Sequence, residues 1–284
     1  MGWLIGGIIV ISSVLGGYVL SHGELIALWQ PFELLIIGGA ALGSFISSNP
    51  LKVIRGVFSR IPYLLRGSRY TKALYMDVLA LLYQLFNKWR REGLVGLEED
   101  VDDPETSPIF LAYPQITNDP RIMEFITDYL RIISSGNMSA HELESLMEAD
   151  IETAFEESEL SSDAVTKIAD ALPGFGIVAA VLGIVITMKS LGGPPEELGM
   201  HVAAALVGTF LGILLAYGFV GPIGIALGHM AREEVKCLEC IKVSILAMLS
   251  GVPPQLAVEF GRKTLYTTER PSFGELEEHV KNSG

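Results

Sequence analysis

The chain has 284 residues, of which 50% are hydrophobic and 19% are charged, with 30 glycines and a formal net charge of −13 at pH 7. Of the 33 acids, 19 fall between Glu98 and Asp170, so the net charge reflects one acidic stretch, and nothing in that stretch indicates nucleic acid as a partner. The apolar residues are concentrated in a few long runs, which argues against a soluble domain, where they would be spread at helical or strand spacing.

Four runs contain no Asp, Glu, Lys or Arg and are long enough, with their flanks, to cross a bilayer. A helix needs about 20 apolar residues to span the hydrocarbon core. The four runs are Met1–His22, Leu34–Leu51, Ala171–Met188 and Gly199–Ala231. We therefore predict an all-α fold, a polytopic membrane protein with four transmembrane helices and a helical cytoplasmic domain.

The distribution of basic residues predicts the orientation. Nine Lys and Arg residues stand against two acids between Pro50 and Val95, whereas the connections around 22–33 and 192–200 contain no Lys or Arg. Cytoplasmic loops carry the excess of Lys and Arg, so both termini are expected in the cytoplasm. The predicted segments are transmembrane helices over 1–21, 34–50, 170–190 and 201–228, periplasmic loops over 22–33 and 191–200, a cytoplasmic helical region over 51–169, and a cytoplasmic tail over 229–284.

Within the cytoplasmic region, the apolar spacing predicts an amphipathic helix over Thr71–Arg91. An acidic, turn-rich link over 93–108 follows, in which prolines are expected to end regular structure. Further helices are predicted over Arg121–Ser134 and from Ser139 onward, where Ser139 and Glu142 have the spacing of a capping box.

The sequence contains no motif of an enzyme, a nucleotide site or a metal site. Cys237 and Cys240 form the only CxxC, and a structural zinc site needs a second pair. We interpret these cysteines as reduced thiols on a helix, and we predict no enzymatic activity, no metal and no cofactor. Glycines at four-residue spacing inside the apolar runs instead predict close helix–helix contacts. These pairs are Gly39/Gly43, Gly208/Gly212 and Gly224/Gly228.

None of the predicted spans has an acid near its centre, although an ion path needs a group that binds the ion inside the membrane. The chain therefore either carries no ion or forms the walls of a path whose carboxylate belongs to another chain. Thr209 and Tyr217, eight residues apart in the last span, are candidates to line such a path. The alternative for Thr209 is a local one, a hydroxyl bonded to the carbonyl one turn earlier.

Two prolines are candidates for a hinge beside this path. Pro222 removes the hydrogen bond that its amide would make to the Gly218 carbonyl and is expected to kink the helix. Pro173 is expected at the same membrane level, just inside the preceding span, where the alternative is a proline tolerated in a first turn.

Several phrases together resemble one known family. They are LPGFGIVAAVLGIV (172–185), VGTFLGILLAYGF (207–219), VEFGRKTLYTTERPSFGELEEHV (258–280), YTKALYMDVLALLY (70–83), and WQPFELLIIGGAALGSF, which has Trp29 where the family has Tyr. They resemble the A subunit of the bacterial flagellar stator, MotA, of the MotA/TolQ/ExbB family. The resemblance implies an inner-membrane protein in a ring of A subunits, five as the expected number, around a dimer of MotB-type B subunits that supply the membrane aspartate.

The resemblance also assigns roles to single residues. The family's two membrane prolines match Pro173 and Pro222, and its pore-facing threonine matches Thr209. The resemblance implies that Arg90 and Glu98 contact the rotor protein FliG. The alternative for Arg90 is a solvated cation at a helix end, and the adjacent Arg91 leaves open which arginine meets the rotor.

The resemblance further predicts the coupling ion. In sodium-driven relatives a threonine of the third span stands opposite the fourth-span threonine, and the matching position here is Ala180, seven residues after Pro173. A methyl group there removes an oxygen ligand that sodium would need, so we expect a proton channel. The alternative is that Ala180 faces a neighbouring helix and has no bearing on the ion.

Two other functions remain open at this point. One is an energiser of outer-membrane processes similar to ExbB and TolQ, which have three membrane helices. The other is a structural membrane scaffold without an ion path, in which Thr209 and the prolines serve packing alone.

Overall fold

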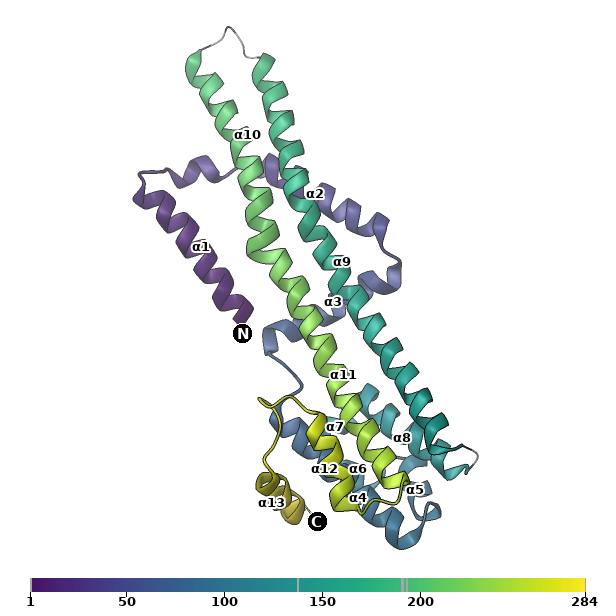
Figure 1. The fold of residues 1–284 in the computed structure, drawn as a ribbon. Helices are drawn as coiled ribbons and strands as arrows, with labels where there is room; N and C mark the ends of the chain where they lie inside the picture. Colours follow the sequence, from purple (N-terminus) through teal and green to yellow (C-terminus); the bar gives the residue numbers. More distant parts are fainter. Residues whose placement is uncertain (1, 137, 190–191, 193, 284) are drawn as a thin grey trace. The chain divides into compact units, whose positions relative to one another are not determined.

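The computed structural model describes residues 2–136, 138–189, 192 and 194–283, and every regular element within them is helical (Figure 1). The predicted all-α fold is thus confirmed for this part of the chain. The chain divides into two compact units, which we describe separately. The membrane unit comprises Met1–Gly67 and Glu157–Met230, and the globular unit comprises Ser68–Glu156 and Ala231–Gly284.

The membrane unit contains the predicted spans. Its elements are α1 (Gly2–Leu20), η1 (Leu25–Leu28), α2 (Pro31–Ser48), α3 (Leu51–Arg66), the second part of α9 (Ala140–Lys189), α10 (Pro195–Leu215), the π-helical η3 (Ala216–Val220) and the first part of α11 (Gly221–Leu249). Helix α2 begins before the predicted residue 34 because Pro31 occupies its first turn, where a proline is well tolerated. Residues 190, 191 and 193, at the predicted boundary of the second periplasmic loop, lie outside the described residues.

Four helical stretches in the described residues are long and apolar enough to cross a membrane: Gly2–Leu20, Leu25–Ser48, Ala140–Lys189 and Pro195–Leu249. Helix α1 buries none of its residues, and α9 exposes a broad apolar face that includes Ile177, Leu182 and Val185. Contiguous exposed apolar surface of this extent requires lipid or other protein chains to cover it. The protein is therefore a membrane protein.

The globular unit is built around α4 (Lys72–Glu92). The predicted apolar face of this helix is confirmed, because Leu74, Val78 and Leu81 are buried together with Leu82 and Leu85. Its core is completed by the other helices of the unit. These are η2 (Val95–Leu97), α5 (Glu98–Asp102), α6 (Pro108–Leu111), α7 (Pro114–Thr117), α8 (Pro120–Ser134), the first part of α9, the second part of α11, α12 (Pro254–Thr264) and α13 (Phe273–Ser283).

The irregular link expected in this region needs correction. The link over 93–108 is largely helical, since η2 and α5 occupy it and Pro108 starts α6 with Ser107 as its cap, accepting a hydrogen bond from the Phe110 amide. Helix α9 also continues without a break through Pro173. The capping box at its start is confirmed, because the Ser139 amide donates to Glu142 (2.9 Å) and the Glu142 amide donates to the Ser139 hydroxyl (3.3 Å).

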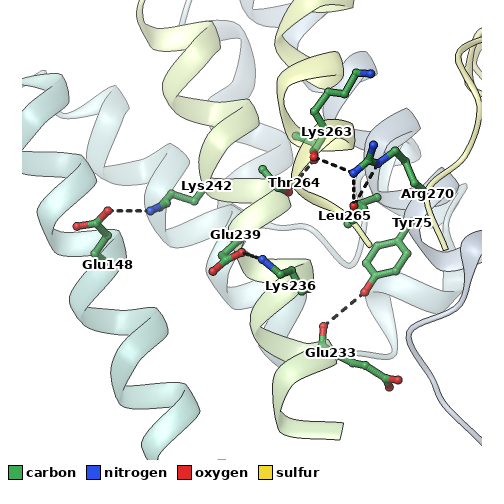
Figure 2. Close-up of polar contacts among 11 residues, drawn as sticks. Tyr75, Glu148, Glu233, Lys236, Glu239, Lys242, Lys263, Thr264, Leu265 and Arg270 are labelled. Atoms are coloured by element: carbon green, nitrogen blue, oxygen red, sulfur yellow. Dashed lines mark hydrogen bonds and ion pairs between the residues drawn. The ribbon is translucent and has the colours of Figure 1, made fainter. Parts of the chain in front are cut away.

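Polar contacts hold the C-terminal segment of the globular unit (Figure 2). Lys242 on α11 pairs with Glu148 on α9 at 3.0 Å, and Arg270 donates to the Leu265 carbonyl at 2.7 Å. Helix α12 lies very close to α11, because a methyl group placed on Gly261 would lie 2.5 Å from the Cys240 carbonyl oxygen. Only glycine allows this approach of the two helix backbones.

Candidate functional site

The membrane unit brings α9 and α10 into direct backbone contact along small residues. A methyl group on Gly176 would lie 3.0 Å from the Gly208 carbonyl oxygen, and one on Gly212 would lie 2.8 Å from the Leu172 carbonyl oxygen. A methyl group on Gly183 would lie 2.9 Å from the Cβ of Ala205. We call Gly176, Gly183, Ala205, Gly208 and Gly212 the glycine seam.

The seam extends to the start of α11. The Ser162 hydroxyl donates to the Gly224 carbonyl at 2.8 Å, and a methyl group on Gly228 would lie 3.0 Å from the same hydroxyl. Close contacts at the predicted pairs Gly208/Gly212 and Gly224/Gly228 are thus confirmed. The prediction for Gly39/Gly43 is wrong within this chain, because methyl groups on both glycines would meet open space.

The predicted path residues Thr209 and Ala180 lie beside the seam at the same level. The Thr209 Cα is 3.3 Å from a methyl group placed on Gly176, and the Ala180 amide nitrogen is 3.4 Å from one placed on Gly208. Both residues are half-buried. Tyr217 is 67% exposed, so in this chain its ring points away from the packed interior.

The Thr209 hydroxyl differs in its hydrogen bonding from the hydroxyls of Thr187 and Thr166 in the same unit. Thr187 donates to the Gly183 carbonyl at 2.8 Å and Thr166 donates to the Ser162 carbonyl at 3.0 Å, the usual local bond of a membrane threonine. No hydrogen bond of the Thr209 hydroxyl occurs within the described residues. Its oxygen is therefore available to an ion, a water molecule or a partner chain.

Helix geometry changes just before Pro222. Over η3 the backbone is π-helical, and the Gly221 amide donates to the Ala216 carbonyl, five residues earlier. A proline lacks an amide proton and its ring clashes with the carbonyl four residues back, so a wider turn accommodates it. The expected disturbance at Pro222 is present as a π segment within a continuing helix.

The two prolines do not lie at one level. Gly221, adjacent to Pro222, packs beside Ala169, whereas the Leu172 carbonyl adjacent to Pro173 packs beside Gly212. At about 1.5 Å per residue, the prolines are therefore offset by more than one helical turn. Pro173 also lies deep inside α9 and not in a first turn, so the simple first-turn interpretation is wrong.

In the globular unit, Arg90 and Glu98 are both exposed, on the last turn of α4 and at the start of α5. The salt bridges and hydrogen bonds found between described residues include neither side chain. Both charges are consequently free to meet another molecule.

Three polar residues hold α5 against its neighbours. The buried Asp100 accepts from the Lys88 ammonium (2.6 Å) and from the Ser107 hydroxyl (2.6 Å), and Arg131 donates to the Val101 carbonyl (2.6 Å). The hydrogen bond to Asp100 raises the pKa of Lys88, which keeps the ammonium group charged. Sequence reasoning missed Lys88, Asp100 and Arg131, because their partners lie across turns at spacings that no helix pattern predicts.

Cys237 and Cys240 are fully buried, and burial raises the pKa of both thiols, that of Cys240 to about 12, so they are poor nucleophiles. The described residues contain no cluster of three or more His, Cys, Asp or Glu side chains that could hold a metal. Glu33, in the first turn of α2, has one carboxylate oxygen buried without a hydrogen-bond partner in the described part of the chain.

Comparison with known proteins agrees with this description. Residues 4–93 match the family described as Motility protein A N-terminal, and residues 119–239 match the MotA/TolQ/ExbB proton channel family. The chain is 51% identical to Motility protein A of Salmonella typhimurium and of Escherichia coli K12, over 98% of this chain and 94% of each relative. It is 40% identical to Chemotaxis protein LafT of Vibrio parahaemolyticus, over 96% of both chains.

Two solved structures are similar in fold. A chain of C. jejuni MotAB gives a TM-score of 0.79 at 20% identity, over 95% of this chain and 98% of that chain. A chain of the Bacillus subtilis flagellar MotAB stator complex gives 0.69 at 25% identity, over 90% and 92%. The four candidate spans and the match of residues 119–239 thus define a polytopic helical membrane protein of the proton-channel class. The chain belongs to the MotA/TolQ/ExbB proton channel family, on its motility protein A branch.

Proposed function

We propose that this chain is the A subunit of a bacterial flagellar stator, which forms a proton channel with a MotB-type partner and converts ion flow into torque on the rotor. The observation that carries the proposal is the 51% identity to two Motility protein A sequences over 98% of this chain. The seam, which has helix backbones in contact and no carboxylate, supports it because such a path needs an acid from a partner.

The partner supplies the membrane aspartate, and the A subunits form a ring, five in number, around a dimer of B subunits. The exposed apolar faces of α1 and α9 support an assembly in lipid. Moving one charge through 100 mV releases about 2.3 kcal/mol, several times the thermal energy, so a few ions suffice for one mechanical step.

Pro173 and Pro222 act as coupling residues in this proposal. The π segment η3 precedes Pro222 and begins one turn after Gly212. A change in the charge of the partner aspartate would therefore act next to a helix turn that is already wider than an α-helical turn. Thr209, with its unbonded hydroxyl, lines the path together with Ala180 and Tyr217.

Arg90 and Glu98 contact the rotor protein FliG in this proposal. Their exposure, and the contacts of Lys88 and Asp100 that hold α5, support a rigid charged surface. Charges at the rim of an interface govern steering and register more than affinity, as a moving contact requires.

The protein lies in the inner membrane with both termini in the cytoplasm, as the Lys and Arg excess after α2 supports. Reporters fused at the C-terminus and near Asp102 should report the cytoplasm, and one in the loop over 191–200 the periplasm. A periplasmic result near Asp102 would contradict this topology.

An energiser similar to ExbB and TolQ is the second candidate, since the family includes those proteins. The four candidate spans and the match to the Motility protein A N-terminal family favour the stator. The test is to delete the gene. The stator proposal predicts flagella that are assembled but paralysed, and swimming restored by this chain alone. Normal swimming with defective outer-membrane uptake would favour the energiser.

The coupling ion is tested in the restored cells. Swimming should continue in sodium-free buffer and stop when a protonophore collapses the proton gradient. Swimming speed that follows external sodium would contradict the proton proposal and the role given to Ala180.

A further inference from the structure

Helix α3 follows α2 in the membrane unit, and its exposed face carries both apolar and basic side chains. One face packs inward through Val53 and Val57, which are buried against Val165 of α9 and Leu227 of α11. The opposite face is exposed and combines apolar with basic side chains. The exposed residues of that face include Leu51, Lys52, Arg55, Phe58 and Tyr63.

The apolar part of this face lies beside a membrane helix. Phe58 is 58% exposed, and its ring contacts that of Phe45 on α2 edge-on, with centroids 6.4 Å apart. Leu51, seven residues before Phe58 and so on the same side of the helix, is 69% exposed. An exposed apolar stripe that starts at a transmembrane helix is placed to enter the lipid surface.

A cavity of about 220 Å³ lies between α3 and α9, at the edge of this face; Lys52 belongs to both, whereas Arg55 is exposed beside Lys52 and does not line the cavity. Lys52, Ser59 and Arg60 line it from α3, and Glu157 and Ser161 line it from α9. Two cations stand against the one carboxylate of Glu157. Within the described residues, neither Lys52 nor Arg55 forms a salt bridge or a side-chain hydrogen bond.

Arg60 fixes one wall of this cavity. Its guanidinium donates to the Ser158 carbonyl (3.1 Å), the Ser158 hydroxyl (2.8 Å) and the Ser161 hydroxyl (3.3 Å). These partners are neutral, so they satisfy donors without cancelling the charge. A methyl group on Gly56 would lie 3.0 Å from the Ser161 hydroxyl, so α3 and α9 lie close together there.

We propose that α3 is an interfacial helix whose Lys52, Arg55 and Arg60 bind the phosphate of an anionic phospholipid, while Leu51 and Phe58 enter the acyl region of the same leaflet. Basic side chains next to a membrane helix attract anionic lipid, at roughly fivefold in binding for each residue. The proposal concerns lipid binding by the chain and does not depend on ion coupling or on the rotor.

The test is native mass spectrometry of the full chain purified in neutral detergent, with phosphatidylglycerol or phosphatidylcholine added. The wild type should retain phosphatidylglycerol in preference to phosphatidylcholine. Lys52→Gln with Arg55→Gln should reduce that preference by about 30-fold, the product of two roughly fivefold effects. Lys263→Gln with Arg91→Gln, two exposed cations of the globular unit, is the matched control and should retain it.

A second variant distinguishes charge from folding. Lys52→Arg with Arg55→Lys keeps both charges and should keep the preference, and inorganic phosphate at equal ionic strength should not displace the lipid. The proposal is overturned if Lys52→Gln with Arg55→Gln binds phosphatidylglycerol as the wild type does. It is also overturned if the control pair loses the preference equally, or if inorganic phosphate displaces the lipid.

Discussion

The two units of this protein are packed by different means. In the membrane unit helix backbones lie in direct contact at Gly176, Gly208 and Gly212, and the described residues of this unit form no ion pair with one another. In the globular unit large side chains such as Phe86 and Leu82 fill the core, and buried polar groups such as Asp100 are paired. Lipid is as apolar as leucine, so close backbone packing holds membrane helices together, whereas water drives large side chains into a core.

This difference predicts where each unit fails. A loss of volume should damage the globular unit most. A gain of volume should damage the glycine contacts, which are several along the seam and include Gly261 in the globular unit. The exposed charges Arg90 and Glu98 should tolerate substitution structurally, because both side chains lie at the surface.

The largest effect is expected from Phe86→Ala. Phe86 is fully buried in the core on α4, and removing a buried Phe side chain costs about 3–5 kcal/mol. Thermal unfolding of the purified chain should show a lower midpoint, and the amount of protein in membranes should fall. Val95→Ala, at a side chain that is 75% exposed, is the control and should change neither measurement.

Gly176→Ala is expected to have the next largest effect. The added methyl would lie 3.0 Å from the Gly208 carbonyl oxygen and 3.2 Å from the Gly212 Cα, so the helices must move apart. Overpacking of this kind costs about 1–3 kcal/mol. Swimming should be lost while the protein still reaches the membrane.

Gly174→Ala is the matched control, two residues earlier in α9, where a methyl group meets nothing within 4 Å. It should swim normally. Equal behaviour of the two variants would show that the seam does not require close contact.

Pro222→Ala should affect motion more than folding. Alanine supplies the missing amide proton and favours an α-helical turn in place of η3, so the protein should be at least as stable as the wild type. Swimming speed should nevertheless fall, because the widened segment would be lost. Normal swimming of this variant would reduce Pro222 to a packing residue.

Arg90→Glu is expected to have the smallest structural effect. The side chain is exposed, so the amount and thermal stability of the protein should not change, while swimming should be impaired, with Glu98→Lys milder. A charge reversal on the rotor side should partly restore motion, because the two surfaces would again be complementary. If no rotor reversal restores motion, Arg90 is a solvated helix-end cation.

Sequence periodicity predicted the parts of this structure that depend on local pattern. The apolar face of α4 and the cap at Ser139 follow from spacing within one helix. A second capping box, Ser272 with Glu275 at the start of α13, has the same signature and could have been read from it. Hydrogen bonds donated by Lys72 and Ser272 lower the pKa of the Glu275 carboxyl group to about 2.

Features that depend on distant partners were not predictable in this way. Gly176 of α9 contacts Gly208 and Gly212 of the facing helix α10, although no second glycine stands four residues from Gly176. Lys88 and Asp100 pair across a turn that the sequence indicated as irregular. Helix α9 continues through Pro173. Helix propensity alone disfavours a proline inside a helix, so it does not predict this continuity.

Proton flux most directly tests the proposal that the membrane unit forms the ion path and the globular unit makes the rotor contact. The chain would be co-purified with its B-type partner, reconstituted into vesicles under an imposed proton gradient, and followed with a pH-sensitive dye, using wild type, Gly176→Ala and Arg90→Glu. Arg90→Glu should conduct like the wild type although its cells do not swim, and Gly176→Ala should conduct little. Lost flux in Arg90→Glu, or full flux in Gly176→Ala, would contradict the assignment of the ion path to the membrane unit and the rotor contact to the globular unit.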